Sequence, residues 1–180
     1  IERDLQFIIL NRLNPGKVLI ISGAQGVGKT HLLKDISRYY EGICLYLNAE
    51  EHQVKKLLLG RDSQKYREYI NNKLILLIDD ADYLPKLEEV LQAIRNTTPN
   101  LKIIISTTFQ PNLQGLDNMR LDYTLYPLTH KECQQRQWGI KKLDHLEQRL
   151  IYGNYPKMLE LLSNIEKQLY LNELFDIYLI

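Results

Sequence analysis

Residues 23–30 read Gly23-Ala24-Gln25-Gly26-Val27-Gly28-Lys29-Thr30, which fits the pattern G-x-x-x-x-G-K-[ST] at every fixed position. The glycines let the backbone turn so that its N–H groups point inward and cradle phosphate oxygens. We expect Lys29 to reach the β- and γ-phosphates and the Thr30 hydroxyl to ligate Mg²⁺. An apolar run precedes the stretch and a helical pattern follows it. The sequence therefore predicts a phosphate-binding loop made of all eight residues.

Two acids, Asp79 and Asp80, directly follow the apolar run 74–78. Such a run is typical of a strand in the middle of a parallel sheet, and it ends at the edge where the phosphate loop also sits. We expect Asp79 to hold Mg²⁺, usually through water, and Asp80 to orient and deprotonate the attacking water. The alternative is a solvated acidic turn that continues through Asp82.

Apolar runs alternate with helical patterns from the N-terminal end to Pro127. The predicted strands are 17–22, 43–47, 74–78, 102–105 and 122–126. The predicted helices are a first one around residues 5–13, then 29–40, 52–70 with a break at Gly60, and 86–95. Alternation of this kind predicts an α/β fold, with a mostly parallel sheet flanked by helices.

The pattern changes after Pro127, because residues 129–180 show helical periodicity without a convincing strand, interrupted at 153–156. We therefore predict two parts, an α/β core at 1–128 and a small all-helical subdomain at 129–180. The final segment is apolar over much of its circumference. It either packs into this subdomain or meets a surface in sequence outside this chain.

The composition is that of a globular protein, with 180 residues, 44% hydrophobic and 25% charged residues. A formal net charge of +1 argues against a dedicated polyanion-binding domain. Cys44 and Cys133 lie far apart, so we expect a reducing compartment and no zinc site. No apolar run is long enough to cross a bilayer and no signal peptide is evident, so we expect a cytoplasmic protein. Because the chain begins with Ile1, we expect a fragment.

The spacing of the motifs narrows the class of nucleotide-binding protein. About 50 residues, including the predicted strand 43–47, separate Thr30 from Asp79. This leaves room for a strand between the loop strand and the acid strand, as in the additional-strand, catalytic-acid class of P-loop ATPases. A guanine-specific N-K-x-D motif is absent, because the nearest string, Asn72-Lys73-Leu74-Ile75, lacks the Asp. No arginine-studded lid of a nucleoside kinase was found, so the adenine preference is inferred by exclusion.

A more specific resemblance rests on six strings that occur in order, namely GAQGVGKT, YLNAE (46–50), LLIDDADYLP (76–85), IIISTT (103–108), YPLTHKE (126–132) and YGNYP (152–156). Together they resemble the prokaryotic AAA+-type ATPases related to the archaeal ATPase and STAND groups. Many members of the closest family carry a further C-terminal domain of restriction-endonuclease-like fold. The resemblance covers nearly the whole chain and implies an ATP-binding, ATP-hydrolysing P-loop core with a helical lid.

The resemblance also implies roles for individual residues. Thr107 or Thr108 resembles the polar sensor that contacts the γ-phosphate or its attacking water, and Asn48 resembles the residue that engages the catalytic acid. Arg120, just before the last predicted strand, occupies the place of an arginine finger that serves a neighbouring subunit in a homo-oligomer. Pro156 resembles the lid proline that lies against the base and sugar of the nucleotide.

Each of these residues also has a purely structural interpretation. The threonines can simply end a strand, Asn48 can be a turn residue and Pro156 can start a helix. Arg120 can form a surface ion pair with Asp117 or Asp122.

Departures from the family pattern bear on activity. The family commonly has Asp-Glu at positions 79–80, and the shorter Asp80 reaches less far, so we expect slow hydrolysis. It commonly has Arg-Gln at positions 25–26. The rival interpretation is a nucleotide-loaded switch with negligible turnover that controls a partner or a further C-terminal domain. Basic residues between 55 and 67 can form a nucleic-acid patch, or a solvated face interrupted by acids.

Overall fold

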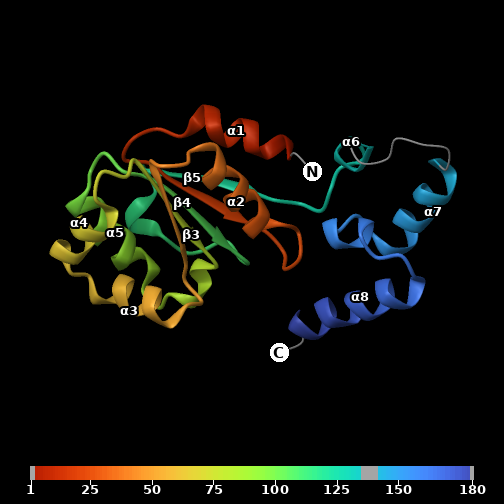
Figure 1. Cartoon of the computed structure of the whole chain (residues 1–180). Helices are drawn as coiled ribbons and strands as arrows, with labels where there is room; N and C mark the ends of the chain where they lie inside the picture. The colour runs from red at the N-terminus through yellow and green to blue at the C-terminus, as the bar shows by residue number, and fades with distance from the viewer. Residues whose placement is uncertain (1–2, 135–141, 179–180) are drawn as a thin grey trace.

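The computed structural model describes residues 3–134 and 142–178, which form a layered α/β core and a helical lobe beside it (Figure 1). The strands are β1 (Val18–Ser22), β2 (Cys44–Asn48), β3 (Ile75–Asp79), β4 (Lys102–Thr107) and β5 (Arg120–Thr124). The helices of the core are α1 (Asp4–Arg12), α2 (Lys29–Tyr39), α3 (His52–Gly60), α4 (Ser63–Ile70) and α5 (Leu87–Thr97). The predicted α/β fold is confirmed.

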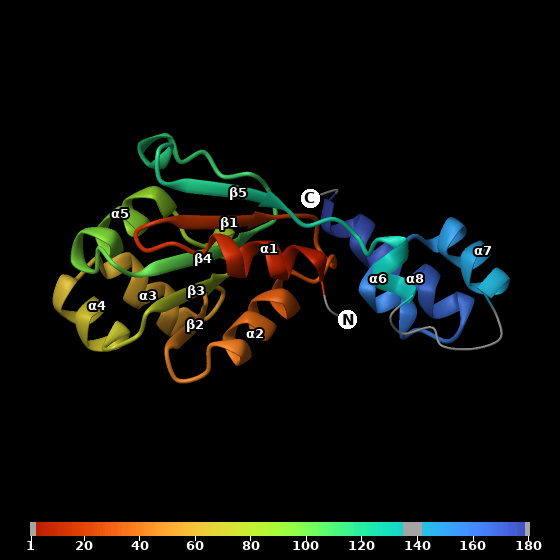
Figure 2. The same cartoon turned by 90° about the horizontal axis from the view of Figure 1, so that it is seen from above.

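The strands of the sheet are all parallel and follow the order β2-β3-β4-β1-β5 (Figure 2). A strand does separate the loop strand β1 from the acid strand β3. It is β4, which follows the acids in the sequence, whereas β2 lies at the edge of the sheet. The predicted strand 43–47, which lies between the two motifs in the sequence, is therefore not the strand that separates β1 from β3. Sequence position between two strands does not fix position between them in the sheet, because helical crossovers carry the chain past its neighbours.

Helices cover both faces of the sheet, which is why the central strands are apolar throughout. Alternate residues of β1 point to opposite faces. Leu19 and Ile21 belong to the cluster that includes Ile9 of α1 and Leu33 of α2. Val18 and Ile20 belong instead to the cluster that includes residues of α3, α4 and α5. The strand that carries the phosphate loop is therefore fixed from both sides.

The last strand begins two residues earlier than the sequence predicted. β5 pairs with β1 in parallel register, so that Arg120 is opposite Val18 and Thr124 is opposite Ser22. The N–H of Val18 donates to the carbonyl of Met119 (3.0 Å), which places the start of pairing before residue 120. Arg120 is thus the first residue of the strand rather than a residue before it.

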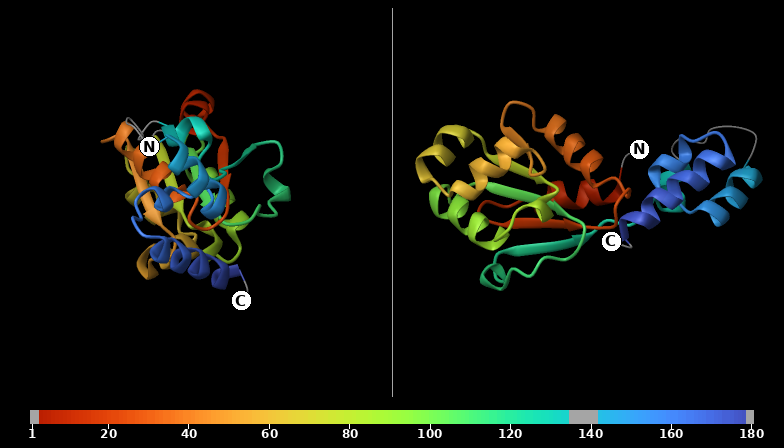
Figure 3. Two further views of the ribbon diagram at one scale, coloured as in Figure 1. Left: turned by 90° about the vertical axis from the view of Figure 1, so that its right-hand side faces the viewer. Right: turned by 90° about the horizontal axis from the view of Figure 1, so that it is seen from below.

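The described residues after β5 build a helical lobe, which the segment after β5 joins to the core (Figure 3). It consists of α6 (His130–Gln134), α7 (Lys142–Tyr152), a 3₁₀ turn (Pro156–Leu159) and α8 (Asn164–Tyr178). The described part of residues 129–178 contains no strand. We call this lobe the lid. None of the described helices has both the length and the apolar character that a membrane span needs.

The last helix, α8, is apolar on several sides but packs on only one. Tyr170 and Leu174 are buried with Met158. Leu169 and Phe175 on other faces are exposed. The segment therefore does pack into the lid, as one of the two alternatives expected, while much of its apolar surface faces outward.

Candidate nucleotide site

Residues 23–28 form a tight loop between β1 and α2, and two glycines make that turn possible. Gly26 and Gly28 have φ angles of 82° and 98°, in the left-handed region that a side chain disfavours. A third, Gly23, allows close approach, because a Cβ there would lie 2.4 Å from the carbonyl oxygen of Leu125. The loop consequently opens directly onto the N-terminal end of α2, where a helix dipole favours anions.

Lys29, the first residue of α2, is held inside this loop. Its Nζ donates to the carbonyls of Gly23 (2.7 Å) and Ala24 (3.2 Å), and the residue is only 4% exposed. Burial lowers the pKa of Lys29, while the carboxylates of Asp80, Asp82 and Asp79 act in the opposite direction. A buried cation at the mouth of a loop of backbone N–H groups is an arrangement that suits phosphate.

A pocket of about 370 Å³ lies between the phosphate loop and the lid. This volume is within the range of small-molecule sites. The predicted residues that line it are Gln25, Gly26, Gly28, Lys29, Thr30, Asp80 and Pro156. The loop, one of the two acids and the lid proline thus share one pocket, although they are far apart in the sequence.

Asp79 ends β3 and is fully buried on the face of the sheet that α2 covers. Its Oδ2 accepts a hydrogen bond from the Tyr46 hydroxyl (2.6 Å) and its Oδ1 accepts one from the Ser106 hydroxyl (2.5 Å). Both carboxylate oxygens are therefore oriented by neutral hydroxyl groups. Carboxylate and threonine hydroxyl oxygens are hard ligands of the kind that Mg²⁺ prefers, and Thr30 supplies the hydroxyl in the neighbouring pocket wall. The residues present therefore fit a magnesium ion.

Asp80 follows in a strained backbone conformation. Its φ of 52° and ψ of 47° are left-handed, and its N–H donates to the hydroxyl of Ser106 (2.8 Å). Burial raises the pKa of the Asp80 carboxyl, the charge of Asp79 raises it further, and Lys29 counteracts both. Strain of this kind is concentrated at functional sites. Asp80 lines the pocket together with Lys29 and Thr30 of the phosphate loop.

The polar residue of β4 that contacts the acids is Ser106, which the sequence reasoning did not name. Contact of Thr107 or Thr108 with the γ-phosphate or its attacking water stays a prediction. Side chains alternate along a strand, so Ser106 shares the face of Asp79 while Thr107 shares the face of Ile105. The Thr107 hydroxyl is buried without a hydrogen-bond partner among the residues described. The N–H of Thr108 donates to Asp82. The side chain of Ser106 is therefore the one at this end of β4 that lies beside Asp79.

Two further predicted residues do not reach the pocket. Asn48 is opposite Asp79 in the sheet, yet its Oδ1 accepts from the N–H of Glu50 (2.9 Å), as the turn alternative expected. Arg120 lies at the amino end of β5, whereas the phosphate loop follows the carboxyl end of β1. Its guanidinium is 3.3 Å from Asp117 and 3.2 Å from Asp122. Within one chain, Arg120 therefore forms the ion pairs of the structural alternative.

The lid contributes residues to the site that the sequence reasoning missed. A Cβ built on Gly26 would lie 2.4 Å from the hydroxyl oxygen of Tyr170, so α8 contacts the phosphate loop directly. Lys157 lines the pocket next to Pro156, and its Nζ lies 4.7 Å from the centre of the Tyr170 ring. Arg3 also lines the pocket, from the segment before α1. A lone arginine or lysine has no sequence pattern that would have revealed this.

The sheet order, the loop after β1 and the acids after β3 are those of the additional-strand type of P-loop fold. The family model described as an AAA domain matches residues 15–134, more than half of the chain. The chain therefore belongs to the AAA domain family and is an ATP-binding module of the AAA+ type. The resemblance seen in the sequence is confirmed.

Individual proteins of known name are also similar to this chain in sequence, at about one-third identity. The chromosomal replication initiator protein DnaA of Campylobacter fetus is 35% identical over 92 residues, which cover 47% of this chain and 21% of that protein. DnaA of Tropheryma whipplei is 32% identical over 123 residues, covering 59% and 26% respectively. The matches thus span about a quarter of the length of these relatives.

Solved structures support the fold over almost the whole chain. A STAND protein with a tetratricopeptide repeat sensor from Pyrococcus horikoshii has a TM-score of 0.60 at 18% identity, covering 90% of this chain and 29% of that one. Domain III of DnaA from Thermotoga maritima has a TM-score of 0.53 at 19% identity, covering 94% and 89%. At such identities the likeness concerns the fold alone.

Proposed function

We propose that this chain binds ATP with Mg²⁺ between the phosphate loop and the lid and hydrolyses it slowly. The observation that carries the proposal is the buried ammonium group of Lys29 in the wall of a pocket that Asp80 also lines. A buried cation and a carboxylate that line one pocket suit phosphoryl transfer to water, because one stabilises the phosphate charge and the other positions the water.

Each residue of the pocket has a definite task in this proposal. Lys29 exchanges its present carbonyl partners for the β- and γ-phosphate oxygens, which are stronger acceptors. Thr30 and Asp79 hold Mg²⁺, which when bound neutralises charge between the two phosphates. Ser106 keeps both acids in place, since it donates to Asp79 and accepts from the N–H of Asp80.

Asp80 is proposed to be the general base. Its raised pKa makes it a stronger base than an ordinary aspartate, which favours removal of a proton from water. Its side chain is one methylene shorter than the glutamate usual in the family, and this limits how close it can come. Slow turnover follows from these two opposing features.

Pro156 is proposed to contact the base and sugar, because it forms the lid wall of the pocket beside Gly28. Adenine remains the base inferred by exclusion from the sequence. A homo-oligomer in which Arg120 reaches the nucleotide of a neighbouring subunit belongs to the same proposal, and it is supported by the position of Arg120 on the edge strand β5.

The second candidate is a nucleotide-loaded switch with negligible turnover that controls a partner. It is favoured by the substitution of aspartate at position 80 and by the two hydroxyl groups that already hold Asp79. In that case the pocket keeps its nucleotide, and the lid that contacts the phosphate loop reports whether ATP or ADP is bound.

A steady-state ATPase assay separates the two candidates. The protein is assayed with Mg²⁺, with and without double-stranded DNA, since the DnaA relatives are named as replication initiators. Measurable turnover that the Asp80→Asn variant loses supports hydrolysis. Tight ATP binding with no turnover in either condition supports the switch.

A further inference from the structure

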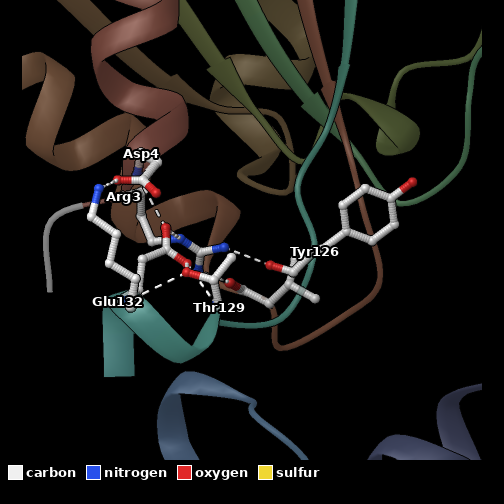
Figure 4. A network of polar contacts seen from close by, with 7 residues as sticks. Arg3, Asp4, Tyr126, Thr129 and Glu132 are labelled. Carbon is white, nitrogen blue, oxygen red and sulfur yellow. Dashed lines mark hydrogen bonds and ion pairs between the residues drawn. The ribbon is translucent and has the colours of Figure 1, made fainter. Parts of the chain in front are cut away.

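Arg3 lies at a point where three separate parts of the chain meet (Figure 4). Its Nη1 donates to the carbonyl of Val27 in the phosphate loop (3.0 Å), and its Nη2 donates to the carbonyl of Tyr126, just before the lid. Its Nε is 3.1 Å from Oε1 of Glu132 in α6. Each nitrogen of the guanidinium thus contacts a different segment. The residue is only 7% exposed, so these contacts replace water almost completely.

Glu132 completes the junction from the lid side. Its Oε1 also accepts from the N–H of Asp4 (3.0 Å), at the start of α1. Its Oε2 accepts from the N–H and the hydroxyl of Thr129 (2.8 and 3.1 Å), and the Thr129 hydroxyl accepts from the N–H of Glu132. This reciprocal pair is a capping box at the first turn of α6. The ion pair therefore joins the N-terminal segment and the phosphate loop to the beginning of the lid.

The same arginine borders the nucleotide pocket. Arg3 lines the pocket together with Gly28 and Pro156. A Cβ built on Gly28 would lie 3.5 Å from the Cγ of Pro156 and 3.8 Å from Nη1 of Arg3. The loop wall, the lid wall and the guanidinium are adjacent, so a shift of Arg3 changes the spacing of the two walls.

We propose that Arg3 is a positioning residue for nucleotide binding, which holds the phosphate loop and the lid at the distance that the nucleotide requires. It acts through Val27 and Glu132. The planar guanidinium holds its two Nη donors in fixed directions toward Val27 and Tyr126 while its charge faces Glu132. The single ammonium nitrogen of a lysine cannot span these separated partners in the same way. Walls that are placed before binding do not have to be ordered when the nucleotide arrives, and this raises affinity. The inference rests on the proposed function of the pocket.

The test measures ADP affinity by calorimetry in four variants, well below their melting temperatures. Arg3→Met keeps an aliphatic side chain but removes the guanidinium group, and we expect ADP to bind roughly tenfold more weakly or worse. Arg3→Lys should be intermediate, because it keeps the charge beside Glu132. Glu132→Gln should also weaken binding. The double variant Arg3→Met/Glu132→Gln should bind ADP no more weakly than Arg3→Met alone, because both changes remove one connection.

Lys131→Gln is the matched control. Lys131 and Asp4 form an ion pair (3.6 Å) between the same two segments, but Lys131 is exposed and does not line the pocket. Exposed pairs contribute little, so ADP affinity should stay within about twofold of the parent. If Arg3→Met does not fold, the ADP affinities of Arg3→Lys and Glu132→Gln decide the question.

Hydrogen exchange provides a readout that a merely structural role would not change. In the parent, ADP should slow amide exchange both in residues 23–30 and in residues 156–160. In the Arg3 variants, ADP at saturating concentration should slow exchange in the loop but much less in the lid.

Variants that melt at lower temperature yet keep parental ADP affinity and lid protection would overturn the inference. Lys29→Ala distinguishes this failure from failure of the proposed function. If Lys29→Ala loses ADP and Arg3→Met does not, only the role of Arg3 is wrong. If Lys29→Ala still binds ADP at parental affinity, the pocket itself has been misassigned.

Discussion

The hydroxyl of Tyr46 lies 2.6 Å from Oδ2 of Asp79 and donates to it across the neighbouring strands β2 and β3. Burial raises the pKa of Tyr46 well above its usual value, and the hydrogen bond to Asp79 raises it further. The hydroxyl therefore keeps its proton, and remains a donor, at any pH at which the protein would act. It fixes one oxygen of the carboxylate that is proposed to hold Mg²⁺.

Tyr46→Phe should raise the Mg²⁺ concentration needed for ATP binding by roughly tenfold, because groups that orient a metal ligand commonly contribute this much. ATP affinity without Mg²⁺ should not change. A magnesium titration of ATP binding checks the expectation. Tyr66→Phe serves as the control, since it removes the hydrogen bond from Tyr66 to the carbonyl of Leu58 within the cluster on the other face of the sheet. An identical magnesium requirement in parent and Tyr46→Phe would show that Tyr46 does not position Asp79 for the ion.

Asp80→Asn should separate binding from chemistry. The amide has nearly the same size but cannot accept the proton of water, so Mg²⁺ and ATP should still bind while hydrolysis falls to background. Asp79→Ala should instead weaken the dependence of binding on Mg²⁺. Parental hydrolysis by both variants would mean that β3 does not carry the catalytic acids.

The pH dependence of hydrolysis gives a second test of Asp80. The base must be ionised, and its pKa is raised above the ordinary value of 3.8. Activity should therefore decline, as the pH is lowered, at a higher pH than an ordinary aspartate would give. The pH profile of kcat/KM under conditions where the protein stays folded measures this. A profile that stays flat down to the ordinary value would argue against Asp80 as the base.

Much of this architecture was predictable because the relevant signals are local. The glycines and Lys29 of residues 23–30 must lie together in any fold, and an apolar run that ends in Asp79 predicts a buried strand with an acid at its edge. Ser106 was missed because the phase of side-chain alternation in β4 depends on register with β3, which only the sheet fixes. Arg3 was missed because its partners Val27, Tyr126 and Glu132 are far from it in the sequence, and no spacing along the chain indicates that they meet.

Glu132→Gln should destabilise the protein by about 3 kcal/mol at neutral pH, because it leaves the Arg3 guanidinium buried without its counter-ion. Burial alone would raise the pKa of Glu132, but the N–H groups of Thr129 and Asp4 and the charge of Arg3 lower it below its ordinary 4.5. A lowered carboxyl pKa contributes stability that is present above the ordinary value and is lost as the pH falls through the lower, folded-state value.

Urea unfolding at several pH values measures this contribution. The stability difference between parent and Glu132→Gln should be constant near neutral pH and shrink below about pH 4.5. A difference that does not change with pH would mean that the Glu132 carboxylate is not stabilised by this junction.

Arg120 has ion-pair partners in its own chain, yet its place on the edge strand β5 would also let it reach a neighbouring subunit. If it serves a neighbour, ATPase activity per subunit should rise with protein concentration, and Arg120→Ala should abolish the rise without changing ATP affinity. An arginine finger contributes about 10³–10⁵ in rate where it is well characterised. Mixing Arg120→Ala with Asp80→Asn should then restore some activity. Activity that is independent of concentration, or no restoration in the mixture, would leave Arg120 with only its pairs to Asp117 and Asp122.

The central claim is that the loop at residues 23–30 binds the phosphates of ATP through Lys29, and calorimetric titration of Lys29→Ala with ATP and Mg²⁺ tests it most directly. Lys17→Ala is the control, because Lys17 also donates to a carbonyl, that of Asn118, but precedes β1 at the end opposite the loop. We expect Lys29→Ala to lose affinity by about 100-fold or more, or roughly 3 kcal/mol, while Lys17→Ala binds ATP like the parent. Parental ATP affinity in Lys29→Ala would contradict the account.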